Sequence, residues 1–322
     1  MAINKYVIML ILVSVILVSG CAGTQKQQQT PSLAARPFVG GTQGIIVIFQ
    51  PNAPPSETTS TDQIEFITKL ENKGESAAKV RKVSLTGISA NAFGIRTPVD
   101  TTVRDLSAVG KVGNTLIPGG QDIVTFTSPR YSGALEGQFS FTATATACYD
   151  YKSQGVATAC ITSNLLQQAT GANACKTSGA KTVYNKGAPI QVTSVEQIPF
   201  GKDTLGFQIK VKNAGGGKVY NSQSCDEKTT TSGTTVTNID RIRVTRVELG
   251  SGVELDCGRT DKTFSLVNNE ATLICKTGKT SGGESKLKGE YTGVVEDLLT
   301  IDLEYNYESW GNVKFTIKAL PG

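Results

Sequence analysis

The C-terminal part of the chain alternates apolar and polar residues with a period of two. The apolar set is Leu299, Ile301, Leu303, Tyr305 and Tyr307, and the alternation repeats at Val313, Phe315 and Ile317 on the return strand of a predicted hairpin, with Trp310 at its loop tip. Successive side chains of a β-strand point to opposite faces, so this pattern predicts strands with one buried and one solvated face. Such strands form two sheets packed face to face, and we therefore predict a β-sandwich.

A similar alternation of apolar and polar residues extends over most of the chain. From Gly44 onward, short alternating apolar runs are separated by clusters of Gly, Pro, Asn and Ser, while helical periodicity is almost absent. Turn residues at short intervals between strand-like runs are typical of all-β sandwiches. The fold class predicted is all-β.

An internal duplication sets the predicted domain organisation. Phe, Lys, Asn and Gly recur at the same relative positions in residues 64–74 and 205–215, and Tyr-x-Tyr-x-Ser-x-Gly recurs at 149–155 and 305–311. Matching order at both ends of each unit indicates two tandem copies of one domain. We predict two sandwiches of about seven strands each, at residues 43–162 and 188–322, joined by a linker at 163–187.

The N-terminus carries a secretion signal. Lys5 and the apolar run from Tyr6 to Val18 precede small residues and Cys21, and this order is that of a cleaved signal peptide at residues 1–20. The segment resembles the lipobox of prokaryotic lipoproteins, in which the cysteine becomes the lipid-modified first residue. The alternative is an ordinary signal or an uncleaved anchor. Residues 21–42 are polar, Gln-rich and interrupted by Pro and Gly, which predicts a flexible stalk.

Six cysteines remain besides Cys21. They are Cys148, Cys160, Cys175, Cys225, Cys257 and Cys275, and the chain contains no histidine. An even number of cysteines in an exported chain predicts three disulfides, and the lack of histidine and of any C-x-x-C disfavours a zinc site. The absence of histidine also removes the usual general base for serine or cysteine nucleophiles.

The pairing of these cysteines is predicted from hairpins. Cys148 and Cys160 would lie on two arms around a turn at residues 153–155, and Cys257 and Cys275 on arms around residues 268–270. Facing positions on two arms have the spacing that a disulfide needs. Elimination leaves Cys175 with Cys225.

The layout resembles the immunoglobulin-like domains of archaeal and bacterial surface proteins, notably the adhesion-related kind whose second strand ends in Asn-x-Gly. More narrowly, Cys148-Tyr-x-Tyr followed by Cys160 and Cys175 is similar to uncharacterised secreted archaeal proteins. The resemblance covers roughly residues 44–320. It implies tandem immunoglobulin-like sandwiches and no assigned active site.

Candidate binding residues are few. Trp310, placed at a loop tip, and the nearby Tyr305 and Tyr307 could form a platform for a carbohydrate or peptide. Tyrosines spaced by two can equally be half-buried core with the hydroxyl at the rim. The carboxylates near the last turn do not form a calcium loop, so no metal and no cofactor are expected.

These patterns favour a lipid-anchored, non-catalytic surface protein that acts as an adhesion or spacer module. Its partners would be the membrane, through lipid on Cys21, and an unknown surface protein or polysaccharide. The charge balance of +5, from 32 basic and 27 acidic residues, is too dispersed to indicate nucleic acid. One alternative is self-assembly into a filament through strand 44–49. Another is an envelope hydrolase that uses carboxylates.

Overall fold

The computed structural model describes residues 37–162, 164–166, 175–231, 234–250, 252–278, 281, 286–287, 291 and 293–319. Over these ranges the chain is all-β, which confirms the predicted fold class. No helix among these residues is long and apolar enough to cross a membrane. The signal segment 1–20, Cys21 and the stalk up to residue 36 lie outside the described residues. Residues 33–322 belong to one compact unit.

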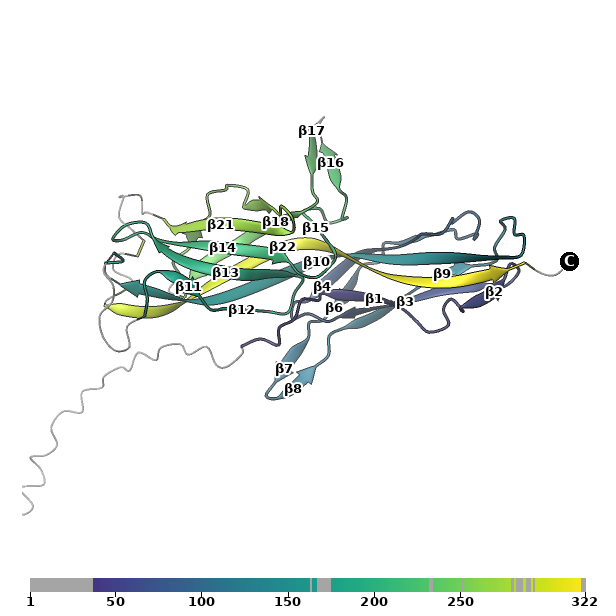
Figure 1. Ribbon diagram of the computed structural model, residues 1–322, viewed down its shortest axis with the longest axis horizontal. Coiled ribbons are helices and arrows are strands. Elements are labelled where there is room, and N and C mark those ends of the chain that lie inside the picture. The colour runs from purple at the N-terminus through teal and green to yellow at the C-terminus, as the bar shows by residue number, and fades with distance from the viewer. Residues whose placement is uncertain are drawn as a thin grey trace, which may run out of the picture. The chain divides into compact units, whose positions relative to one another are not determined.

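A central sheet of ten strands contains the two longest strands, β10 (Gln138–Thr162) and β22 (Val294–Lys318). Each has 25 residues, and the two are antiparallel and paired over their whole length. Figure 1 shows them as adjacent teal and yellow ribbons. The other strands of this sheet are β2 (Glu57–Thr59), β4 (Ala78–Thr86), β5 (Val99–Asp100), β6 (Arg104–Leu106), β12 (Val183–Asn185), β15 (Lys218–Tyr220), β18 (Arg241–Leu249) and β20 (Thr263–Ser265).

Two smaller sheets cover one face of the central sheet. One has three strands, β1 (Ile45–Phe49), β3 (Ile64–Asn72) and β9 (Gln121–Ser128). The other has five, β11 (Gly179–Lys181), β13 (Ile190–Pro199), β14 (Leu205–Asn213), β19 (Leu255–Asp256) and β21 (Glu270–Thr277). Two hairpins project from this body, β7 (Gly110–Val112) with β8 (Thr115–Ile117) and β16 (Lys228–Thr231) with β17 (Thr234–Thr237).

The core lies between the central sheet and its two covers. In both long strands the odd-numbered residues point inward, from Ala143 to Ile161 in β10 and from Leu299 to Ile317 in β22. The alternation predicted for residues 299–307 and 313–317 is therefore confirmed, but the two stretches belong to one continuous strand instead of two arms of a hairpin. Burying these side chains between two layers supplies the main stabilising free energy of such a fold.

The duplicated motifs meet at the middle of the β10–β22 pair. Asp150 lies opposite Asn306, and on either side Tyr149 faces Tyr307 while Tyr151 faces Tyr305. This register gives the two halves an approximate two-fold relation, with the Tyr-x-Tyr motifs crossing at its centre.

The predicted domain boundaries do not divide the described structure into two bodies. Because β10 and β22 run under both covering sheets, each half of the molecule needs strands from both copies. The predicted linker contains β11 and β12, which pair with β13 and β10. The described end of the predicted stalk is held in place too, since Val39 and Gly40 donate backbone hydrogen bonds to Glu75.

Three disulfides form, and only the Cys257–Cys275 pairing was predicted correctly. Cys148 bonds with Cys225, and Cys160 bonds with Cys175. The predicted Cys148–Cys160 bridge is wrong because β10 is extended through residues 153–155 instead of turning there. Twelve residues of strand separate these two cysteines by roughly 40 Å, so the predicted Cys175–Cys225 bridge fails with it.

Candidate functional site

Four tyrosines form a buried cluster at the centre of the β10–β22 pair. Tyr149, Tyr151, Tyr305 and Tyr307 contact one another in a closed ring, with centroids 5.6–6.3 Å apart. Tyr151 donates a hydrogen bond to Asn72 Oδ1 at 3.0 Å, and Tyr307 donates one to Asn213 Oδ1 at 2.8 Å. The Tyr149 and Tyr305 hydroxyls accept from the backbone N–H of Ile45 and Ile190.

These contacts make Tyr305 and Tyr307 core residues rather than an exposed binding platform. Their exposed fractions are 5% and 1%. Burial raises the pKa of Tyr307 to about 12, because desolvation penalises the phenolate. The interpretation of the Tyr-x-Tyr motif as core, with hydroxyls that reach polar partners, is the one that the geometry supports.

Trp310 differs from the tyrosines, since 43% of it is exposed. It does not lie at a loop tip, as predicted, because β22 continues through it and pairs it with Thr146. Beside it is a cavity of about 230 Å³, lined by Gln43–Val47, Gly215–Gly217, Tyr149, Tyr307, Ser309 and Trp310. This Trp310 pocket brings together the start of β1, the glycine-rich turn after β14 and the middle of β22.

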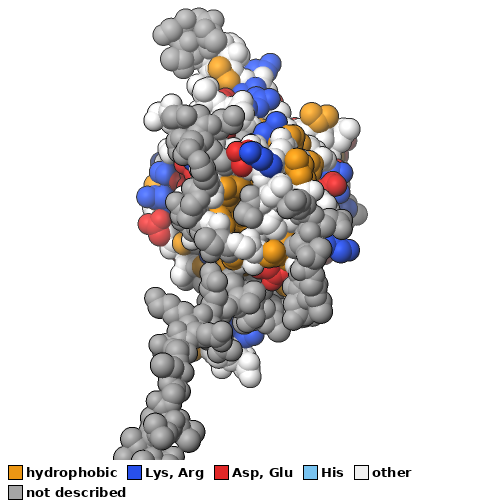
Figure 2. Space-filling view, turned by 90° about the vertical axis from the view of Figure 1, so that its left-hand side faces the viewer, with side chains coloured by type: hydrophobic (Ala, Val, Ile, Leu, Met, Phe, Trp, Pro, Cys, Tyr) orange, Lys and Arg blue, Asp and Glu red, His pale blue; other side chains and the backbone are white. Residues whose placement is uncertain are grey.

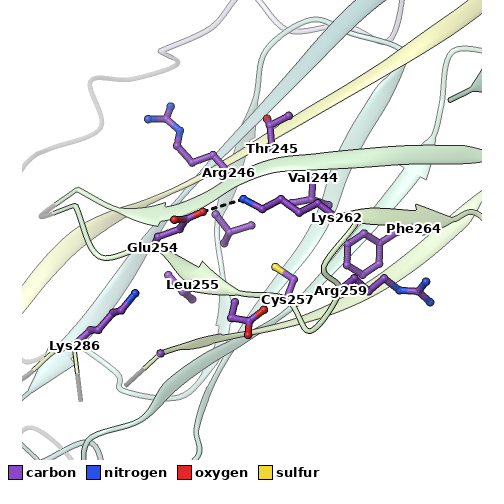
Figure 3. Close-up of a pocket in the computed structure, with 13 residues that line it drawn as sticks. Val244, Thr245, Arg246, Glu254, Leu255, Cys257, Arg259, Lys262, Phe264 and Lys286 are labelled. Carbon is purple, nitrogen blue, oxygen red and sulfur yellow. Dashed lines mark hydrogen bonds and ion pairs between the residues drawn. The ribbon is translucent and has the colours of Figure 1, made fainter. Parts of the chain in front are cut away.

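A second cavity of about 270 Å³ lies next to the Cys257–Cys275 disulfide (Figure 3). Buried apolar side chains of β18, β19 and β20 contribute to its lining, among them Val244, Leu255 and Phe264. Glu254 and Lys262 form an ion pair of 3.1 Å, drawn as the dashed line in Figure 3.

The basic side chains around this second cavity do not converge on it. In Figure 3, Arg246 and Arg259 point away from its centre in different directions. Arg246 forms an ion pair with Asp302 at 2.7 Å, and the Arg259 guanidinium lies 5.2 Å from the centroid of the Phe264 ring. The cavity therefore offers an apolar hollow whose surrounding charges are largely satisfied by protein groups.

The opposite face of the central sheet carries a polar groove, which the sequence analysis missed. Its cavity of about 500 Å³ is lined by Lys79, Asp150, Arg243, Glu304, Asn306 and neighbouring residues. Asp150 accepts hydrogen bonds from Arg81 and from Asn306 Nδ2, both at 2.6 Å. The hydrogen bond with Asp150 raises the pKa of the Arg81 guanidinium, which keeps it charged. The sequence signal for this groove was the set of even-numbered, polar residues that alternate with the buried residues of β10 and β22.

The carboxylates near the start of β22 do not assemble into a metal site. Asp302 accepts from Gln154 and pairs with Arg246, while Glu304 pairs with Lys152. Among the residues that the structure describes, no group of three or more His, Cys, Asp or Glu could hold a metal ion.

Charge is dispersed over the surface that Figure 2 displays, where basic and acidic side chains alternate with small apolar patches. A face of this kind does not resemble the continuous basic footprint of nucleic-acid-binding proteins. No protein-family model matches the chain, and no curated protein matches its sequence.

Proposed function

We infer that the protein is a lipid-anchored, non-catalytic surface protein that serves as an adhesion or spacer module. The observation that carries this proposal is the continuous β10–β22 pair, which joins both halves into one body. A spacer or adhesion module needs fixed geometry over its length, and a shared central sheet supplies it.

The disulfides support an exported location. Three disulfides staple the described part of the chain, and such bridges persist in oxidising compartments outside the cytosol. Cys148–Cys225 links the long strand β10 to the segment after β15, so it holds the two copies together. The anchor itself is proposed on Cys21 and its preceding sequence.

The pockets support binding rather than catalysis. The Trp310 pocket is formed mainly by backbone, glycine and aromatic groups, and the second cavity is apolar at its base. Such surfaces recognise ligands by shape and hydrogen bonds.

Cell fractionation tests the anchor. Intact cells are labelled with a membrane-impermeant biotin reagent, and the wild-type protein is compared with C21A. We expect the wild-type protein to be labelled and to stay with the membrane, and C21A to lose membrane attachment. Wild-type protein that is found unlabelled, or in the soluble fraction, contradicts the proposal.

Binding assays separate adhesion from spacing. The purified protein is applied to isolated cell envelopes and to envelope polysaccharides, with heat-unfolded protein as the control. Saturable retention that is lost on unfolding supports adhesion. Retention on none of these surfaces, together with surface labelling, leaves the spacer role.

A further inference from the structure

We propose that the edge of β22 beside Trp310 is a docking slot for an extended peptide strand of a partner protein. The slot consists of residues 309–315 of β22 and the adjacent edge of β1 at Val47. On its outer side β22 pairs with β18, with β15 up to Glu308 and with β2 from Thr316 onward. Within the described residues no strand pairs with the interval between them.

The unpaired backbone groups in the slot can be identified from the ladder. Even-numbered residues of β22 turn their backbone groups outward, since Thr316 donates its N–H to Ser56 of the segment before β2 and Asp302 accepts from Thr245 of β18. By the same alternation Trp310, Asn312 and Lys314 present their N–H and C=O groups to the open edge. An unpaired edge of this kind is a template for strand addition.

The edge of β1 adds two more unpaired groups. Even-numbered residues of β1 bond with β3, as the Lys73 N–H to Gly44 C=O hydrogen bond shows, so odd-numbered residues face the other way. Of these, Ile45 accepts a hydrogen bond from Ser309 and its N–H donates to Tyr149. Val47 is 7% exposed, and among the described strands β1 pairs with β3 alone. The N–H and C=O of Val47 therefore lie on the edge of β1 that no described strand pairs with.

The other half of the molecule shows how an equivalent slot is filled. By the repeat, Trp310 corresponds to Gln154 and Val47 to Val192. There β12 pairs with residues 155–157 of β10, and the Lys186 N–H donates to the Gln154 C=O at 2.9 Å. The Asn185 side chain bonds with both the N–H and the C=O of Val192, each at 2.9 Å.

The described segment before β1, residues 37–44, does not fill the slot. Residues 38–40 correspond to β12, but the N–H groups of Val39 and Gly40 donate to the Glu75 carboxylate at 2.9 and 2.8 Å. Moreover, Gly40 stands where Asn185 stands in the repeat, so this segment has no amide for Val47. Within the described residues no segment of the chain fills the slot, and we assign it to a strand of another protein.

The β12 segment, which fills the equivalent slot in the other half, indicates the chemistry of the partner strand. It is an extended segment with an aliphatic residue, an aromatic residue and an Asn in succession, as in Val183-Tyr184-Asn185. Its main chain would bond with Asn312 and Trp310, and its Asn amide with Val47. The slot does not depend on the lipid anchor, so C21A is expected to bind the strand as the wild-type protein does.

A synthetic peptide with the sequence of residues 181–188 tests the proposal on the intact protein. Binding is measured by calorimetry, and the fluorescence of Trp310, the one tryptophan of the chain, reports its location. We expect saturable binding with a change in Trp310 emission. Absence of binding, or binding that leaves Trp310 emission unchanged, overturns the proposal.

Altered peptides keep the test independent of protein folding. A peptide with Tyr184→Pro lacks the main-chain N–H that faces Asn312 and is expected not to bind. A peptide with Asn185→Leu loses two hydrogen bonds and should bind about tenfold more weakly. Equal binding of all three peptides overturns the proposal.

Two protein variants locate the slot. N312P removes an outward N–H of the slot and should abolish binding. S140P places proline on the unpaired edge of β10, outside the slot, and should leave the affinity unchanged. Loss of binding in S140P, with a circular dichroism spectrum like that of the wild-type protein, contradicts the location.

Discussion

At the scale of single residues, the repeated Asn-x-Gly motif has a role that its backbone preference does not suggest. Asn and Gly tolerate positive φ, so the motif predicts a turn by residue type alone, but neither Asn72 nor Asn213 has a positive φ. Instead both side chains are buried and bond with the loop that follows and with a tyrosine of the central cluster. The turn was predictable from residue type, whereas the buried network depends on strands distant in sequence.

Asn72 should therefore be among the most sensitive positions. Its side chain is fully buried, donates to backbone carbonyls of Ser76 and Ser107 and accepts from Tyr151. Asn72→Ala leaves these partners unsatisfied, and we expect the free energy of unfolding to fall by about 3 kcal/mol. Urea denaturation measures the change, and Asn221→Ala at an exposed site is the control. A change below about 0.5 kcal/mol for Asn72→Ala contradicts this role.

The tyrosine cluster predicts loss of stability at high pH. Burial raises the pKa of Tyr307 from 10.0 to about 12, and those of Tyr149, Tyr151 and Tyr305 shift in the same direction. Because the folded pKa is the higher one, the stabilising effect is complete below pH 10 and is lost as the pH rises towards 12. For Tyr307 alone it amounts to roughly 3 kcal/mol.

Urea midpoints measured from pH 8 to pH 12 check this effect, with tyrosinate absorbance followed in parallel. Tyr307→Phe is less stable at neutral pH, because it loses its bond with Asn213, and should show a shallower alkaline decline. A flat midpoint across the alkaline range is inconsistent with a buried, protonated cluster.

At the scale of elements, the length of β10 and β22 was the feature that sequence analysis did not predict. Serine and glycine at 153–155 and 309–311 were read as turns, yet Gly155 and Gly311 lie in extended strand. Gly155 is needed for close approach, since a Cβ there would lie 2.7 Å from Val192 Cγ2. A glycine required by packing from a distant strand looks, in sequence, like a glycine required by a turn.

The disulfide pattern follows from this difference and can be tested directly. A non-reducing peptide map should link Cys148 with Cys225, Cys160 with Cys175 and Cys257 with Cys275. Cys148–Cys225 closes a loop with a sequence separation of 77 residues, so the double variant C148S/C225S should lose about 4.5 kcal/mol in the chain-entropy description. The Cys160–Cys175 bridge closes a shorter loop, with a sequence separation of 15 residues, so C160S/C175S should lose about 3 kcal/mol. A map that links Cys148 with Cys160 refutes the extended β10.

At the scale of the whole molecule, the two halves that carry the repeated motifs form one body instead of two. The fold class and the repeat could be recognised from local periodicity, but the crossing of the copies could not. It depends on the pairing of residues as far apart as Gln138 and Lys318. No local pattern distinguishes a strand that stays within its copy from one that crosses into the other.

A single cooperative unfolding transition is therefore expected. Calorimetry of the intact protein should show one transition whose calorimetric and van't Hoff enthalpies agree. The separate fragments 43–162 and 188–322 should be unfolded, because each lacks one of the two long strands. Two resolved transitions, or folded fragments, contradict a shared core.

The shared sheet also limits how such a protein can change over generations. In an array of independently folding tandem domains, recombination can add or delete copies, because each domain folds on its own. Here the two copies complete each other across the β10–β22 pair, so a deletion that removes one copy also removes half of the sheet on which the other rests. A change in the number of copies would therefore disrupt the sheet, whereas insertions at its edges, such as the projecting β7–β8 and β16–β17 hairpins, leave it intact.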